Sequence, residues 1–136
     1  MTYAVSAALQ AGVYGALAGD ATLSALVGGA IFDAEPAGSL PELYVTLGPE
    51  AVRAGSDGSG GGAVHEFVIS VVTDAAGFTT AKRAGVLVCD VLIDAELALE
   101  RGRLVSCRFL KAIATRAENG SARRIDLTFR ARVDDG

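Results

Sequence analysis

The chain has 136 residues, of which 51% are hydrophobic and 21% are charged. This length fits one domain, residues 1–136, and the apolar content excludes a disordered chain. Two cysteines exclude a disulfide framework, glycines without a triplet period exclude collagen, and a net charge of -4 disfavours a general nucleic-acid-binding protein.

The N-terminal segment predicts two helices. Over residues 4–18, apolar and small residues recur at steps of three and four, which places them on one helical face. Gly19 ends this helix, and Asp20 is suited to cap a short second helix that stops at Gly28. Because this segment lacks a basic start and large side chains, neither a signal peptide nor a membrane span is expected.

The middle of the chain predicts two strands around a loop. Residues 43–47 form a short run of strand-forming residues, which Gly48 and Pro49 close. Residues 65–74 alternate between two faces that are both partly apolar, as in a strand with both faces covered. Residues 55–62 contain only Gly, Ser and Asp, which predicts a flexible loop.

The C-terminal half predicts a helix and a long hairpin. Residues 79–97 have a helical apolar pattern capped by Thr79 or Thr80, and their apolar surface is wide enough to need a second cover, such as another subunit. Residues 103–116 and 122–134 alternate as strands around an Asn-Gly turn. The predicted fold class is α+β, an antiparallel sheet of about four strands with a long C-terminal hairpin and helices packed on one face.

The sequence offers little catalytic chemistry. His65 is the only histidine, and the adjacent Glu66 lies on the opposite strand face, so a half-buried structural histidine is expected. Cys89 and Cys107 lack a CxxC spacing and are expected to be buried, reduced thiols of a cytoplasmic protein. The Gly-rich loop lacks the Lys and Ser or Thr of a phosphate-binding loop, and the acidic pairs lack metal-loop spacing. We therefore predict no enzyme activity, no catalytic residues, no metal and no cofactor.

Charge is divided unevenly along the chain. Residues 1–100 carry 12 acids and three bases, whereas residues 101–136 carry nine bases and four acids. Periodicity places these bases on the folded hairpin, with the arginines of the last strand on one face and its apolar residues on the other. Phe109 and Phe129 fall at positions expected in the core, so the hairpin is expected to lack exposed aromatic residues for base stacking.

The basic hairpin is the strongest candidate for a functional surface. Arginine side chains suit ion pairs at protein interfaces, so a contact with acidic residues of a neighbouring copy is favoured. A solvated strand face and a nucleic-acid-binding surface are the alternatives. The candidate interface residues are Arg103, Arg108, Arg116, Arg124, Arg130, Arg132, Val86, Leu87 and Asp57.

Several segments occur in an order that resembles a known family over essentially the whole chain. They are the opening helix with its Leu-Val-Gly-Gly turn, LYVTLGPE, HEFVISVVTD, the helix that follows Gly77-Phe78, and GRLVSCRFLKAIATRAENGSARRIDLTFRARVDD. In this order they resemble the tail terminator proteins of long-tailed phages, which are also called tail completion or tail-to-head joining proteins. The Ala- and Arg-rich composition is most similar to the tail terminators of gene transfer agents.

The resemblance implies an α+β subunit of a hexameric ring on the head-proximal end of the tail tube. Such a ring stops tube polymerisation, contacts the tail tube protein and the neck or stopper protein, and lets DNA pass through its lumen without sequence recognition. It implies assembly in the cytoplasm of the producing cell and a final place in the tail or neck of the released particle. A neck stopper or adaptor ring is the alternative, and a small nucleic-acid-binding module using the Arg-rich hairpin is a second alternative.

Overall fold

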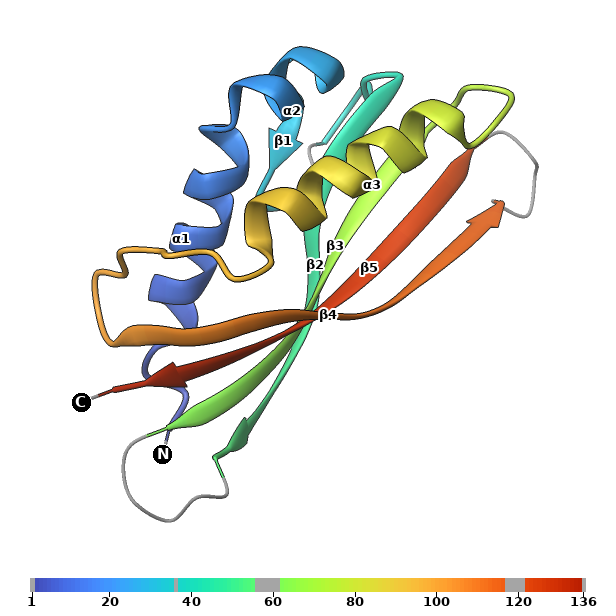
Figure 1. Ribbon diagram of the computed structural model, residues 1–136. Coiled ribbons are helices and arrows are strands. Elements are labelled where there is room, and N and C mark those ends of the chain that lie inside the picture. Colours follow the sequence, from blue (N-terminus) through green and yellow to red (C-terminus); the bar gives the residue numbers. More distant parts are fainter. Residues whose placement is uncertain (1, 36, 56–61, 117–121, 136) are drawn as a thin grey trace.

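The computed structural model describes residues 2–35, 37–55, 62–116 and 122–135. These residues form an α+β domain in which one twisted sheet carries a layer of helices (Figure 1). The elements in chain order are α1 (Ser6–Ala18), α2 (Ala21–Val27), β1 (Ile31–Phe32), β2 (Leu43–Ala54), β3 (Ala63–Thr73), α3 (Thr79–Leu92), β4 (Arg103–Arg116) and β5 (Arg123–Asp134).

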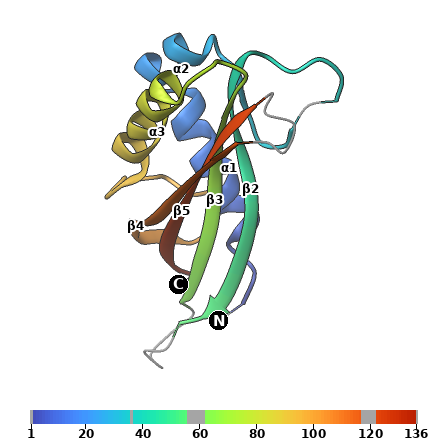
Figure 2. The same cartoon turned by 90° about the vertical axis from the view of Figure 1, so that its right-hand side faces the viewer.

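The sheet has five strands in the order β1-β2-β3-β5-β4. β1 pairs with β2 in parallel, and the other neighbours are antiparallel, so the sheet is mixed. The prediction of about four antiparallel strands is therefore corrected, because the two residues Ile31 and Phe32 were too few to signal a strand. Figure 2 shows α2 and α3 on one side of the sheet, which confirms the predicted helical layer on one face.

β2 extends well beyond its predicted end at Leu47. The register against β3 shifts between Leu47 and Glu50, and pairing then continues to Ala54. Pro49 lies inside this shift, where a residue without a backbone N–H does not interrupt the regular ladder. Gly48 and Pro49 therefore form an irregularity within one strand and do not end it.

The two shortest predicted features at the N-terminus are confirmed. The side chain of Asp20 accepts a hydrogen bond of 2.9 Å from the backbone N–H of Leu23, as a helix cap does. Gly28 ends α2 with a φ of 62°, a left-handed conformation that favours glycine. Together they hold α2 in place between α1 and β1.

α3 is shorter than predicted and is capped differently. It ends at Leu92 instead of residue 97, and its N-cap is Phe78, without a side-chain cap from either threonine. After Leu92 the chain turns to extended backbone, which allows Leu97 and Leu99, two residues apart, to pack against the core. A Cβ added at Gly12 of α1 would lie 2.7 Å from Leu99 Cδ2, so the leucine side chain packs directly over this glycine.

Phe129 of β5 is the largest fully buried side chain described. Its ring stacks on Phe67 of β3 at 5.7 Å between centroids and meets Phe109 of β4 edge-on at 6.0 Å. The predicted alternation of β5 is confirmed, but the prediction that Phe109 is buried is wrong, since 42% of it is exposed. Phe109 lies on the edge strand, where the helical layer covers it only in part.

We expect Phe129→Ala to lower the free energy of unfolding by about 3–5 kcal/mol, because it removes buried ring contacts on both sides and leaves a cavity. Phe109→Ala serves as the matched control and should cost clearly less, since its ring already contacts solvent. Urea unfolding of the two variants beside the parent chain measures both losses. Equal losses would contradict the position assigned to Phe109.

Candidate assembly interface

A hydrogen-bonded cluster links the start of α1 to the sheet. The Ser6 hydroxyl donates to Glu50 at 2.8 Å, and Nδ1 of His65 lies 3.1 Å from Glu50 Oε2. The carboxylate lies between the hydroxyl and the imidazole, so the imidazole is not placed to remove a proton from Ser6. This arrangement holds two strands and a helix together and does not activate a nucleophile.

The structure corrects the prediction for His65. The side chain is fully buried instead of half-buried, and Nε2 has no hydrogen-bond partner among the described residues. Glu66 lies on the opposite strand face as predicted, where it pairs with Arg53 at 3.0 Å. The partner of His65 is Glu50, which the sequence did not reveal because β2 was expected to end before it.

Glu50 is held in its charged form by its neighbours. Burial raises the pKa of this carboxyl, but hydrogen bonds from His65, Ser6 and Tyr3 together lower it by more than burial raises it. The pKa of Glu50 therefore lies below its usual value. The side chain is also largely shielded from solvent, which limits screening of these bonds. Glu50 as a whole residue is exposed, so the ionised carboxylate bonds Ser6 and His65 at the edge of the core.

The two thiols are poor nucleophiles. Burial, with a smaller effect of Asp94, raises the pKa of Cys107 to about 11. Cys89 is only half-buried, which corrects the expectation of full burial, and burial followed by Asp90 raises its pKa as well. Across the described segments, no group of three His, Cys, Asp or Glu residues is arranged to hold a metal ion. Among these same residues, no helix is long and apolar enough to cross a membrane.

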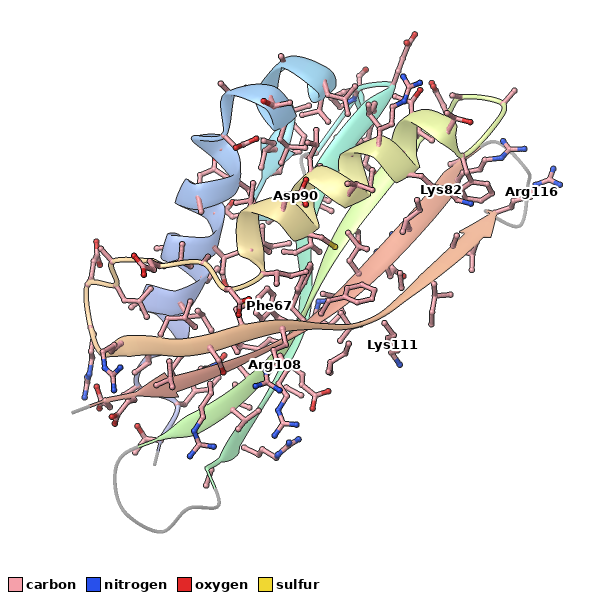
Figure 3. The ribbon with its side chains drawn as sticks, viewed as in Figure 1. Phe67, Lys82, Asp90, Arg108, Lys111 and Arg116 are labelled. Atoms are coloured by element: carbon pink, nitrogen blue, oxygen red, sulfur yellow. The ribbon has the colours of Figure 1, made fainter. Side chains whose placement is uncertain are left out.

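The predicted arginine face exists, and it lies on the side of the sheet away from the helices. The pairing of β4 with β5 places Arg108 directly opposite Arg130. These two arginines and Arg132 line a groove of about 300 Å³. Figure 3 shows Arg108 pointing away from the helical layer. Two like charges at opposite positions of neighbouring strands repel each other, and Glu66, the partner of Arg130 on β3, offsets part of this charge. The β4 side of the groove, at Arg108, is therefore the part that favours an anionic partner.

The remaining predicted interface residues are not equivalent. Arg124 contacts Asp126 at 2.8 Å and Ser70 at 3.1 Å, and Arg103 lies 3.5 Å from Asp134, so both have partners in their own chain. Arg116 is exposed at the end of β4. Asp57 lies outside the described residues. The arginines therefore do not form one uniform basic surface.

A second groove lies between α3 and the β4–β5 hairpin, on the helical face. Its volume is about 390 Å³, and Lys82 and Asp90 are the charged residues among those that line it. Most of its lining is apolar, and it comprises Gly85, Val86, Cys89, Phe109, Ala112, Ala114, Ile125 and Leu127. Small residues on the strands leave this space open beneath the helix. We refer to it below as the α3–hairpin groove.

Val86 separates this groove from a hollow between α2 and α3. The hollow has a volume of about 610 Å³, and Leu26, Val86 and Leu87 contribute to its apolar wall. Val86 is 59% exposed, whereas Leu87 is half-buried against the core. The wide apolar surface predicted for α3 is thus divided. Leu87 packs against the core of the same chain, whereas Val86 is exposed. Phe109 adds to this exposed apolar surface and was missed by the sequence analysis, although the small residues Ala112 and Ala114 farther along the same strand were a signal of an open space beside it.

Glu50→Gln should lower the free energy of unfolding by about 1–2 kcal/mol at neutral pH, because a charged hydrogen-bond acceptor is lost. Since the folded chain lowers the pKa of Glu50, its charge stabilises the fold above the ordinary value of 4.5, and this contribution is lost as the pH falls through the lower folded value. Urea unfolding from pH 7 to pH 3 should show the two proteins converging below pH 4.5. Glu66→Gln, which breaks an exposed ion pair, is the control and should cost less. A gap that stays constant down to pH 3 would contradict this role of Glu50.

Comparisons with known proteins identify the family of the chain. No curated protein shows significant similarity to the chain. Among solved structures, a chain from the virion of a native gene transfer agent particle is 59% identical, with a TM-score of 0.91, and the match covers 98% of this chain and 99% of that chain. The family described as tail completion protein gp17 matches residues 11–134. Because this match spans most of the sequence, the chain belongs to the tail completion protein gp17 family.

Proposed function

We propose that the protein forms a hexameric ring on the head-proximal end of a phage-like tail tube, stops the growth of the tube and joins the tail to the neck. The family establishes the coarser part of this function, a structural role in tail joining. The observation that carries the proposal is the near-complete, 59% identical match to a chain of a gene transfer agent virion. The particle is accordingly of the gene transfer agent type.

The partners follow from this position. The ring contacts further copies of the chain, the tail tube protein on one side and the neck or stopper protein on the other. DNA passes through the lumen without sequence-specific contacts. The subunits are made and assembled in the cytoplasm of the producing cell, and the ring then remains in the tail of the released particle.

Two features of the subunit support assembly into a ring. A closed ring of identical subunits uses two different surfaces on each copy, one for each neighbour. The edge strand β4 presents exposed apolar and basic residues, whereas residues 33–42 at the other edge of the sheet carry three acids and no base. These unlike edges suit a contact between one copy and the next.

The arginines have different roles in this proposal. Arg108, Arg130 and Arg132 form the basic groove on the open sheet face, and they meet carboxylates of a neighbouring copy or of the tube. Arg103 contributes through an ion pair with Asp134 that joins β4 to β5, and Arg124 contributes through a hydrogen bond to Ser70 that joins β5 to β3. Arg116 and Val86 contact the next subunit at the β4 edge.

Particles produced without the protein should have tails of uncontrolled length or tails detached from heads, because nothing then caps the tube. Negative-stain electron microscopy measures tail length and the fraction of joined tails. Supplying the protein from a plasmid should restore both, which controls for effects on neighbouring genes. The purified chain mixed with tail tubes should add a ring of about 80 kDa, six copies of a 13.8 kDa chain. Normal, attached tails in its absence would refute the proposal.

A further inference from the structure

The two edges of the sheet carry opposite charge at the same end of the molecule. Leu43 of β2 is paired with Thr73, which is paired with Arg123, which is paired with Arg116 of β4. One row of residues therefore crosses the sheet from the end of segment 33–42 to the end of β4. The acidic segment and the basic end of the hairpin lie at the two ends of this row.

The acidic side of this row has a shape suited to insertion. Residues 37–42 contain Leu40, which is 47% exposed and followed by Pro41. Gly38 has a φ of 87°, which directs the turn, and the ring of Pro41 restricts the backbone next to Leu40. Such a restricted turn loses little conformational entropy when it docks. Glu42 is exposed beside it.

The basic side of the row has a site of matching chemistry. The α3–hairpin groove has a mostly apolar lining, and its two charged residues, Lys82 and Asp90, both belong to α3. Figure 3 shows Lys82 of α3 and Arg116 at the end of β4 toward the same end of the molecule, with Asp90 farther along the helix. An apolar side chain followed by one carboxylate therefore complements the Lys82 end of this groove in both polarity and charge.

We propose that segment 37–42 of one copy docks into the α3–hairpin groove of the next copy, with Leu40 in the apolar groove and Glu42 facing Lys82. This contact rests on the proposed ring and assigns the two surfaces that close it. Because the surfaces differ and lie at opposite edges, each copy offers one and receives the other, so the contact propagates head to tail. A pair of copies joined in this way still has one free groove and one free segment.

Native Cys89 lines the groove and provides a direct test. Particles or tube-bound rings carrying Leu40→Cys are treated with a short bifunctional thiol reagent and analysed on a denaturing gel. The contact joins residue 40 of each copy to Cys89 of the next, so the product should be a ladder that extends beyond the dimer. A symmetric contact would stop at the dimer and would overturn the head-to-tail arrangement.

Two variants control the crosslink. Leu40→Cys/Cys89→Ser keeps the new thiol but removes the groove thiol, and the ladder should be lost. Tyr3→Cys places an exposed thiol next to the start of α1, away from the segment 37–42, and should give no ladder. Joined tails of normal length without the Leu40→Cys ladder, in a sample where mass spectrometry shows that the reagent has modified Cys89, would overturn the contact and leave the proposed tail-joining function intact.

A charge exchange tests the same contact without relying on crosslinking, and it also decides the outcome if Leu40→Cys prevents assembly. Glu42→Lys and Lys82→Glu should each reduce the fraction of joined tails, because each places like charges at the contact. The combined Glu42→Lys/Lys82→Glu variant should restore joining, since the pair is present with its signs reversed. Failure of the double variant to recover, with both single variants folded by circular dichroism, would overturn the proposed pairing.

Discussion

The layer of helices does not cover every strand of the sheet, and the candidate interface at β4 exists because this edge strand is left uncovered. α3 packs against β3 and β5, but β4 from Arg108 to Arg116 is exposed along its length. A 14-residue edge strand presents unpaired backbone groups and is a hazard in an isolated protein. Register shifts near Val105 and Leu110 interrupt the regularity of this edge, and basic side chains along it oppose uncontrolled pairing. These features oppose edge-to-edge pairing while the apolar side chains of β4 stay exposed.

The distribution of charge also distinguishes the two edges of the sheet. A chain with a net charge of -4 has no general attraction for polyanions, but the division between its acidic first 100 residues and its basic hairpin creates two unlike edges. Unlike edges favour contacts between different surfaces of identical subunits and oppose contacts between like surfaces. In the proposed ring, charge would therefore select the polarity of assembly, and burial of Val86 and Phe109 would provide most of its free energy.

Sequence periodicity predicted what depends on local pattern. The alternation of β5, the cap at Asp20 and the basic face of the hairpin follow from spacing alone, and all are present. Features that depend on distant contacts were not predictable. Glu50 joins His65 only because β2 continues through a Pro-containing bulge, and α3 ends at Leu92 because Leu97 and Leu99 pack in extended backbone. The exposure of Phe109 depends on which strand lies at the edge of the sheet, and a local sequence pattern does not predict the order of strands. For the same reason, the α3–hairpin groove has no signature in the sequence beyond small residues on one strand.

The Glu50–His65 cluster and segment 37–42 lie toward opposite ends of the sheet. His65 and Thr73 are eight residues apart on β3, which corresponds to about 27 Å along a strand. The Glu50–His65 cluster anchors α1 toward one end of the sheet and segment 37–42 lies toward the other, whereas the α3–hairpin groove lies between them, with Phe109 in the row of Phe67 and Ile125 in the row of Val71. Substitutions in the cluster are therefore expected to change the stability of the subunit and to leave segment 37–42 unaltered. In the proposed ring, a subunit gains from keeping the bonds that stabilise its fold away from the segment that meets a neighbour.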